Sequence, residues 1–411
     1  MIVVTFNYRV NALGSLPNLA FERLGLLNLG LRDQERALQF VQKYISVFGG
    51  DPRRVTLGGR SAGAHSVGIH LFHNQKKVDG ASPLFSQAIL QSGGVTARTF
   101  PPASFPLYQK QFARFLHLVG CEASAAASDT KLLECLRTAP ISAIQKASNQ
   151  VYELSEYSLT WPFQPTSGGP LLEHRGSTAG ANGEFFRVPV LTSSTLDEAK
   201  FYAPLNLTTN EHFLSFLGIS IPGLNKADLA DLDALYPDPL QHADSPYKNS
   251  PVSSQYNRIS AALTDYMYAC PVQETAIRMS SSVPVYKLSW AVNNRFPSWQ
   301  GIPHTVDTAY TWAEPLSPTK GGLEYPEVGK LLHGYYVNFV INGDPNKGNA
   351  TQGLALHAPV WPPFKDNYKD GKPGMQLRME AFGNSTAQAD SRRRKQCEWW
   401  RDTSRAERLG K

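Results

Sequence analysis

The segment Val55-Thr-Leu-Gly-Gly-Arg-Ser-Ala-Gly63 constrains the fold of this chain more than any other part of it. An apolar strand pattern leads into Gly59-x-Ser61-x-Gly63, and a helical pattern follows. This order is typical of a strand that turns sharply into a helix and displays a serine at the turn. Glycine suits positions beside such a turn because it has no side chain and tolerates strained backbone angles. The pattern predicts Ser61 as a nucleophile at the top of a sheet; an ordinary strand-to-helix turn is the alternative.

Further apolar runs alternate with helical patterns along the chain. They predict strands at 2–6, 55–57, 85–91, 188–193 and 283–290, and helices at 31–48 and 62–71. Strands that alternate with helices indicate an α/β fold, with a mostly parallel central sheet and helices on both faces. The loop-rich stretches 101–183 and 203–260 are predicted to be partly helical insertions that form a cap. We expect one large domain over residues 1–411.

The composition narrows the class of protein. Hydrophobic residues make up 42% of the 411 residues and charged residues 18%, which argues against disorder. No apolar run reaches the length of about 18 residues that a transmembrane helix needs. Much of the net charge of +6 lies near the end, at Arg392, Arg393, Arg394, Lys395, Arg401, Arg405 and Arg408. A nucleic-acid patch is one interpretation, but no nucleic-acid motif accompanies these charges, so we expect a solvated helix face and no nucleic-acid partner.

The cysteines and sequons bear on the compartment. None of the 4 cysteines, Cys121, Cys135, Cys270 and Cys397, is spaced as C-x-x-C, so neither a zinc site nor a redox site is predicted. The cysteines could form two disulfides or remain buried thiols. Glycosylation sequons begin at Asn206, Asn349 and Asn384. Together these features favour an oxidising, secretory compartment. The first residues show no signal-peptide pattern, which points the other way.

Several motifs resemble those of type-B carboxylesterases, a family that includes cholinesterases, liver-type carboxylesterases and fungal lipases. They occur in the family's order and cover nearly the whole chain. The sequence that follows Ser61 resembles that of fungal members. The motifs are Asn28-Leu-Gly-Leu-Arg-Asp-Gln34, Ala37 to Val41, Phe48-Gly-Gly-Asp-Pro52, Val55 to Gly63, Gln91-Ser-Gly93, Asn338 to Pro345 and Val360-Trp-Pro362. The resemblance implies an α/β-hydrolase fold and serine-dependent hydrolysis of small-molecule or lipid esters, without metal or cofactor.

Nucleophile, acid and base follow one another in that order in this fold. An acidic pair, Asp197-Glu198, follows the strand predicted at 188–193. The family reads Asp-Glu-Gly at this place, so the resemblance favours Glu198 as the acid, although this chain has Ala199 for the glycine. From the residues alone, a solvated loop carboxylate is the better interpretation of Glu198, and the family resemblance reverses it.

The candidate base is His304, which stands in Gly301-Ile-Pro-His304 with Asp307 shortly after it. This setting resembles that of the family's catalytic histidine. The chain has 10 histidines, and the others are expected to lie away from Ser61. His65, His70 and His73 are expected to point away from Ser61 along the following helix, His117 and His333 to pack or face solvent on helices, and His174, His212, His242 and His357 to lie in loops.

The chain departs from the family in two places. Arg60 stands where the family usually has Glu, and we expect it to tune the site. No Gly-Gly-Gly run, which would mark the family's oxyanion loop, precedes Ser61. We therefore expect an N-terminally truncated chain that lacks the early strands and the first disulfide. Of the oxyanion donors, only the backbone N–H of Ala62 is then expected to remain.

These departures leave two interpretations of the activity. The favoured one is a serine ester hydrolase, with this sequence an incomplete gene product. The alternative is a catalytically impaired or non-catalytic chain of the same family. The resemblance further implies Cys121–Cys135 and Cys270–Cys397 disulfides and a secreted protein. The sequence makes no prediction of the oligomeric state, and it does not separate a lipase from a short-chain esterase.

Overall fold

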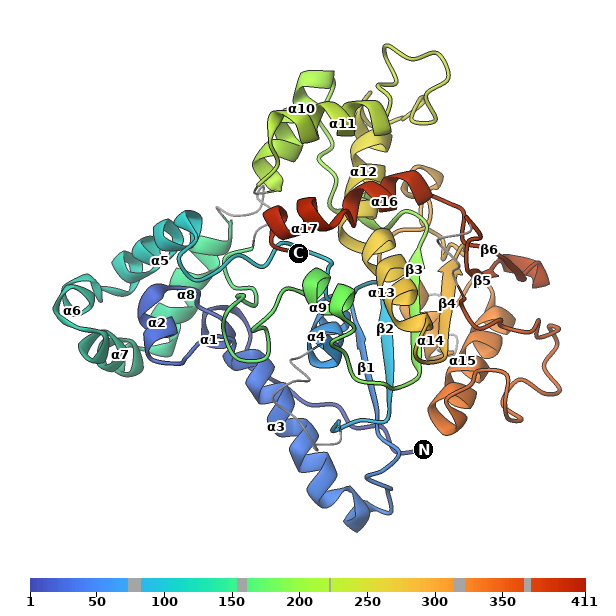
Figure 1. Cartoon of the computed structure of the whole chain (residues 1–411), viewed down its shortest axis with the longest axis horizontal. Coiled ribbons are helices and arrows are strands. Elements are labelled where there is room, and N and C mark those ends of the chain that lie inside the picture. Colours follow the sequence, from blue (N-terminus) through green and yellow to red (C-terminus); the bar gives the residue numbers. More distant parts are fainter. Residues whose placement is uncertain (73–82, 154–160, 222, 314–321, 366–370) are drawn as a thin grey trace.

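A computed structural model describes residues 1–72, 83–153, 161–221, 223–313, 322–365 and 371–411. Their strands form one sheet in the order β1-β2-β3-β4-β5-β6. Strands β1 to β5 run parallel, and β6 pairs antiparallel with β5. The strands are β1 (Thr56–Arg60), β2 (Gln87–Gln91), β3 (Val190–Thr195), β4 (Val285–Trp290), β5 (Met375–Met379) and β6 (Thr386–Ala389). The predicted mostly parallel α/β sheet is confirmed (Figure 1).

Helices cover both faces of this sheet. On β2, Ala88 and Leu90 belong to one hydrophobic core cluster and Ile89 to another, because alternate side chains of a strand point to opposite faces. The first cluster includes side chains of α3 (Leu29–Tyr44), α4 (Ala62–Phe72) and α13 (Cys270–Ser280). The second includes side chains of α14 (Asp307–Thr311) and α15 (Pro326–Asn342). Every residue of β3 and of β4 is buried between these layers.

The predicted insertions contain helices that extend away from the sheet, except α9 (Gly176–Asn182), which packs against α4 (Figure 1). The first holds α5 (Pro106–Val119), α6 (Glu122–Ala127), α7 (Asp129–Thr138), α8 (Ile141–Glu153) and α9. The second holds α10 (Asn210–Ser220), α11 (Lys226–Leu235) and α12 (Tyr256–Thr264). The short helices α1 (Asn11–Gly14) and α2 (Leu19–Arg23) lie beside α5 to α8, and Ala12 and Phe21 share a core cluster with that group.

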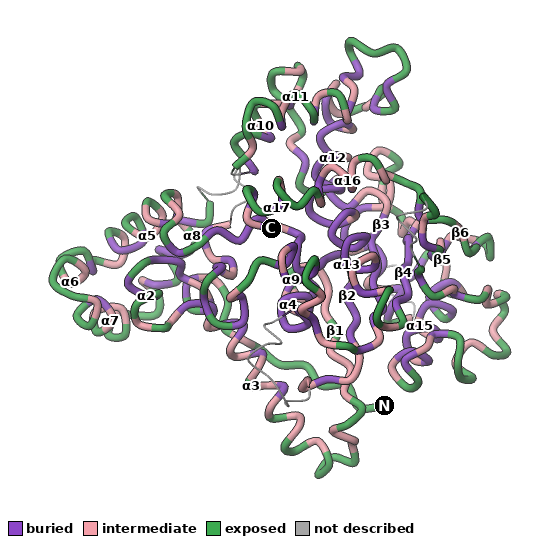
Figure 2. Tube along the Cα trace, viewed as in Figure 1, coloured by how far each residue is buried: buried purple, intermediate pink, exposed green. Residues whose placement is uncertain are grey.

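The prediction of a strand at 2–6 is wrong. These residues belong to no strand, and Ile2, Val3, Val4 and Phe6 are exposed (Figure 2). An apolar, β-branched run favours extended backbone, but a strand also needs a hydrogen-bonded neighbour. Within the described ranges β1 pairs with β2 alone, and residues 2–6 do not join its other edge.

Other boundaries differ in detail. The helix predicted at 31–48 is α3, which ends at Tyr44 and continues as the 3-10 turn η1 (Ile45–Phe48). Strands β5 and β6 are not among the strands predicted from the sequence. Strand β6 is mostly exposed and carries no apolar pattern, so its residues give little strand signal.

Both disulfides implied by the family resemblance are formed. Cys121 pairs with Cys135, 14 positions apart, within the first insertion. Cys270 pairs with Cys397, 127 positions apart, and this bond ties α13 to α16 (Arg394–Trp400). Among the described residues, no helix has the length and apolar character to cross a membrane.

The basic residues near the end form ion pairs, so the expectation of a solvated helix face is wrong for several of them. Arg393 contacts Asp265 at 2.6 Å. Arg405 and Arg408, both on α17 (Thr403–Leu409), contact Asp228 of α11 at 3.2 and 2.7 Å. Arg405 and Arg408 therefore attach α17 to the second insertion, whereas Arg393 attaches the start of α16 to the turn that follows α12.

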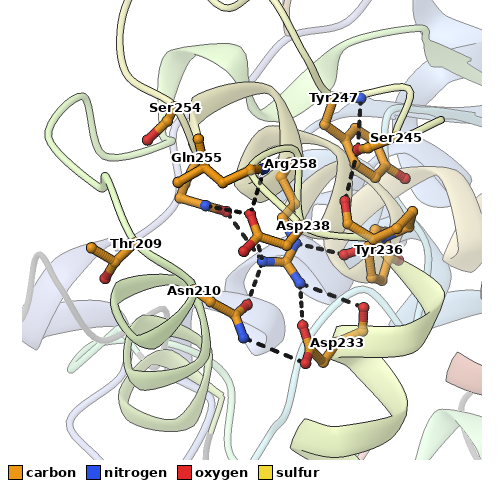
Figure 3. Close-up of polar contacts among 12 residues, drawn as sticks. Thr209, Asn210, Asp233, Tyr236, Asp238, Ser245, Tyr247, Ser254, Gln255 and Arg258 are labelled. Carbon is orange, nitrogen blue, oxygen red and sulfur yellow. Dashed lines mark hydrogen bonds and ion pairs between the residues drawn. The ribbon is translucent and has the colours of Figure 1, made fainter. Parts of the chain in front are cut away.

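One fully buried arginine organises the second insertion (Figure 3). Arg258 of α12 is 0% exposed. Its guanidinium donates to the Tyr236 carbonyl at 2.5 Å, to Asn210 Oδ1 at 2.6 Å and to Asp233 Oδ1 at 2.5 Å. The guanidinium also lies 3.8 Å from the centre of the Phe213 ring. Arg258 thus connects α10, α11 and the segment that follows α11 to α12.

Candidate active site

Ser61 stands at the turn between β1 and α4. Its φ of 55° lies in the left-handed region, which costs free energy for a residue with a side chain. A Cβ on Gly59 would lie 2.4 Å from the backbone of Gly63, so the close approach requires glycine at position 59. Apart from its chain neighbours and the backbone of its own helix, a Cβ on Gly63 would meet no described atom within 4 Å. The close approach at the turn therefore accounts for glycine at position 59, whereas contacts outside α4 do not account for Gly63.

The three predicted triad residues come together. His304 Nε2 lies 2.8 Å from Ser61 Oγ, and His304 Nδ1 lies 2.5 Å from Glu198 Oε2. Both His304, at 1% exposure, and Glu198, at 0%, are buried. A nucleophile within hydrogen-bond reach of a base, which is oriented in turn by a third group, is the geometry of an activated hydroxyl.

Glu198 is held as an anion. It begins the short 3-10 helix η3 (Glu198–Phe201) directly after β3. Its Oε1 accepts a hydrogen bond from the Thr195 backbone N–H at 2.7 Å. Burial alone would raise the pKa of Glu198, but the charge and the hydrogen bond of His304 outweigh burial and lower it. Glu198 can therefore stabilise a protonated imidazole.

The neighbouring Asp197 braces the loop that carries His304. Its Oδ2 accepts a hydrogen bond from the Ile302 backbone N–H at 3.0 Å. Gly301 has a φ of 60°, and a Cβ there would lie 2.4 Å from Asp197 Oδ2. The two members of the acidic pair thus have separate contacts: Glu198 touches the imidazole and Asp197 touches the loop before it.

Aromatic side chains that the sequence analysis missed surround His304. The Tyr268 ring centre lies 4.6 Å from that of His304, and the Tyr202 ring centre lies 5.7 Å from it. Tyr268 belongs to the π-helical turn η4 (Asp265–Ala269) between α12 and α13. π-helical turns are frequent at functional sites. No sequence pattern marks such a turn, because it is one extra residue inside an otherwise helical segment.

His65 lies closer to the site than expected. Its ring is stacked against Tyr268 at 6.3 Å, and Tyr268 in turn packs on His304. Burial, followed by the charge of Arg98, lowers the pKa of His65 well below its usual value, so this imidazole is neutral. His65 is therefore a packing residue behind Tyr268.

Most other histidines have contacts or positions that separate them from Ser61. His70 Nε2 contacts Gln34 at 3.0 Å, His117 contacts Glu122 at 2.8 Å, and His333 contacts the Thr311 carbonyl at 3.0 Å. His174, His212, His242 and His357 are exposed. His73 lies outside the described residues.

Asp307 is a second buried carboxyl group beside the triad. It is 1% exposed, and its Oδ2 lies 3.5 Å from Gln91 Nε2. Burial and then the charge of Glu198 raise the pKa of Asp307 to about 6. In the sequence, Asp307 is recognisable only as the acidic residue that follows the candidate base His304, and its burial could not be predicted.

Ala62 is exposed at the first position of α4. The first N–H groups of a helix have no acceptor within the helix, and the helix dipole adds positive charge there. The Ala62 N–H is therefore suitably placed, next to Ser61, to donate to a negatively charged oxygen.

The model of the carboxylesterase family matches residues 1–400. The chain belongs to the carboxylesterase family. It is 47% identical over 412 residues to secreted lipase 4 of Gibberella zeae, covering 100% of this chain and 71% of that protein. It is 29% identical to lipase 2 of Geotrichum candidum, covering 85% of this chain and 61% of the lipase. It is 28% identical to the acetylcholinesterase of Bungarus fasciatus, covering 93% of this chain and 64% of that protein.

A solved structure supports the same assignment. The crystal structure of Aspergillus niger EstA matches 99% of this carboxylesterase-family chain and 74% of its own, with a TM-score of 0.80 and 26% identity. The α/β-hydrolase fold and the family resemblance are both confirmed, and the chain is classed with carboxylic ester hydrolases. It spans between 61% and 71% of the curated relatives named above.

Proposed function

We propose that this chain hydrolyses carboxylic esters through a triad of Ser61, Glu198 and His304. The observation that carries the proposal is the continuous contact from Ser61 Oγ through His304 to Glu198, at 2.8 and 2.5 Å. No residue of the triad has to move before it can react.

In the proposed reaction, His304 Nε2 takes the proton of Ser61 Oγ while this oxygen attacks the ester carbonyl carbon. The carbonyl oxygen becomes negative and accepts a hydrogen bond from the Ala62 N–H. The carbon–oxygen ester bond then breaks, and His304 returns the proton to the departing alcohol. A water attacks the acyl-enzyme with His304 again as base, which releases the carboxylic acid and restores Ser61.

The surroundings of Glu198 favour an apolar ester. Phe201 and Tyr202 follow it in sequence and are 43% and 36% exposed. The Phe201 ring packs against Phe296 with their centres 5.5 Å apart. Exposed aromatic rings beside a catalytic group suit an acyl chain or an apolar alcohol. We therefore propose a small-molecule or lipid ester as the substrate.

The test is hydrolysis of a series of p-nitrophenyl esters from acetate to palmitate by the full chain, beside Ser61→Ala. Ser66→Ala on α4 is the matched control. We expect Ser61→Ala to lower kcat by about 10⁴-fold or more, with Ser66→Ala close to the wild-type value. A folded wild-type chain that hydrolyses no ester and forms no acyl-enzyme would contradict the proposal.

We also propose that the protein is secreted and glycosylated. Asn206, Asn349 and Asn384 are exposed, both disulfides are formed, and one relative is named a secreted lipase. Expression of the chain behind a signal peptide in a eukaryotic host tests glycosylation. Glycosidase treatment should lower the apparent mass of the wild type, and Gln at all three asparagines should remove that change.

A further inference from the structure

A row of polar side chains crosses the sheet directly before the nucleophile. Arg60, Gln91 and Ser193 are register partners on β1, β2 and β3. Register partners on parallel strands point to the same face of a sheet. Gln91 Nε2 donates to Thr311 Oγ1 at 2.9 Å and lies 3.5 Å from Asp307 Oδ2, so this face is the one that α14 covers. The Arg60 side chain therefore shares a face with Asp307, and Gln91 lies between them.

Arg60 and Asp307 each have one buried polar side-chain atom that could form a further hydrogen bond. Neither Arg60 Nη1 nor Asp307 Oδ1 has a hydrogen-bond partner on another residue within the described parts of the chain. An isolated buried charge is costly, whereas opposite charges in the same region offset one another even without direct contact. Consistent with this, the charge of Arg60 acts to lower the pKa of Asp307.

The other titratable groups around Asp307 come from several elements. Glu198 of η3 raises the pKa of Asp307, and Arg60 and His304 lower it. Tyr336 of α15 has its own pKa raised by burial, so it is neutral and adds no charge. His333 of α15 contacts α14 through the Thr311 carbonyl. Arg60 is consequently the permanent cation within this group.

We propose that Arg60 is a positioning residue for the catalytic base: its guanidinium compensates the Asp307 carboxylate across Gln91, so that Glu198 remains the effective anionic partner of His304. The inference rests on the proposed function. The family usually has Glu at position 60, which would place a third acid beside Glu198 and Asp307. Arg60 reverses that charge, and the surroundings of His304 become less negative.

The charge balance gives a signed prediction. Arg60→Gln makes the surroundings of His304 more negative, Asp307→Asn makes them more positive, and the double variant restores the balance. On the acid side of the pH profile, called here the acid limb, kcat/KM rises with pH because only a neutral imidazole can act as the base. We expect that limb to move up in Arg60→Gln, but by less than about one pH unit, because Asp307 takes up part of a proton when the cation is lost. The limb should move down in Asp307→Asn and return to near the wild-type position in the double variant.

The first measurement is the titration of the Asp307 carboxyl by ¹³C NMR, assigned by its loss in Asp307→Asn. We expect its midpoint to rise by about one pH unit in Arg60→Gln and to stay in place in Arg60→Lys, which keeps the charge. Arg53→Gln, at a side chain that is 89% exposed, removes the same charge at the surface and is the matched control. Equal midpoints in Arg60→Gln and Arg53→Gln would overturn the proposal.

The pH profile of kcat/KM is the second measurement. A double variant whose acid limb is displaced as far as that of Arg60→Gln would also overturn the proposal. If the wild type hydrolyses no ester, the proposed function fails, while the carboxyl titration still tests the link between Arg60 and Asp307. If Arg60→Gln does not fold, Arg60→Lys must keep the Asp307 midpoint and Asp307→Asn must lower the acid limb; either failure contradicts the inference.

Discussion

The second insertion and the catalytic site both bury charge, but they satisfy it differently. Around Arg258, each guanidinium nitrogen donates to at least one acceptor on a neighbouring residue, and an aromatic ring covers the plane. Around His304, Arg60 Nη1 and Asp307 Oδ1 are buried, and no other residue in the described ranges forms a hydrogen bond with either atom. A fully bonded charge fixes geometry, because any movement breaks several hydrogen bonds. A charged group with a free hydrogen-bonding atom can shift its position or its protonation when a proton moves nearby.

This difference separates contacts that stabilise the fold from contacts that support the proposed reaction. Arg258 holds helices together, and its loss should be visible in stability before activity. Glu198 holds one imidazole, and its loss should be visible in activity before stability.

Glu198→Gln should lower kcat by about 10⁴-fold, because an amide can orient the imidazole in the wrong tautomer and cannot stabilise its charge. Steady-state hydrolysis of a p-nitrophenyl ester measures the effect. The melting temperature should change little. A loss below tenfold would mean that Glu198 is not the acid of the triad, and Asp197→Asn in the same assay would then be the variant to examine.

Arg258→Gln should lower the free energy of unfolding by about 3–5 kcal/mol, because it leaves the buried Asp238 carboxylate without its cationic partner and the Tyr236 carbonyl without its donor. Denaturant titration measures the change, with the exposed Arg53→Gln as control. Activity per folded molecule should stay near the wild-type value. A fall in kcat of folded protein would show that this network also supports the chemistry.

Asp307→Asn should stabilise the protein above neutral pH. The folded pKa of Asp307, about 6, exceeds its ordinary 3.8. Its stabilising contribution is therefore fully present below pH ~4 and is lost as the pH rises through 6. We expect the variant to gain about 2–3 kcal/mol at pH 8 and nothing at pH 4. The exposed Asp244→Asn should show no such pH dependence, and an equal gain at both pH values would contradict the reasoning.

Asn210→Ala should cost about 1–2 kcal/mol of unfolding free energy, because it removes one of several acceptors of the Arg258 guanidinium. The same denaturant titration measures it, beside the exposed Gln241→Ala. The sum of the Asn210→Ala and Arg258→Gln effects should exceed that of the double variant, since both changes act on one hydrogen bond. Additive effects would show that Asn210 contributes independently of Arg258.

The sequence predicted the elements that carry local signals. Ser61 could be found from the glycine beside it and the strand before it, and the alternation of strands and helices predicted the parallel sheet. Glu198 and His304 required the family resemblance, because a loop carboxylate and a loop histidine have no pattern of their own. The contacts that join them depend on the sheet, which brings segments 106 positions apart within 2.5 Å.

Features that depend on distant partners could not be predicted. Residues 2–6 have the composition of a strand, yet strand formation depends on a neighbour that their own sequence does not specify. The position of Tyr268 against His304 depends on a π-helical turn, and the Arg258 network depends on how α10, α11 and α12 pack. The side chains of Arg393 and Arg405 suggested solvent exposure, but Asp265 and Asp228 lie within reach only after folding.

The members of the proposed triad differ in how firmly the sheet supports them. Ser61 follows β1, the border strand of the described sheet, whose residues are at most partly buried; Glu198 follows β3, which is buried throughout. Amide hydrogens at a border strand exchange with solvent more readily than those in the middle of a sheet. If the border opens locally, we expect the distance from Ser61 Oγ to His304 to grow while the pair of Glu198 and His304 stays intact. On warming, hydrolysis should therefore be lost at a temperature below that of global melting, because Ser61 moves away from His304 first.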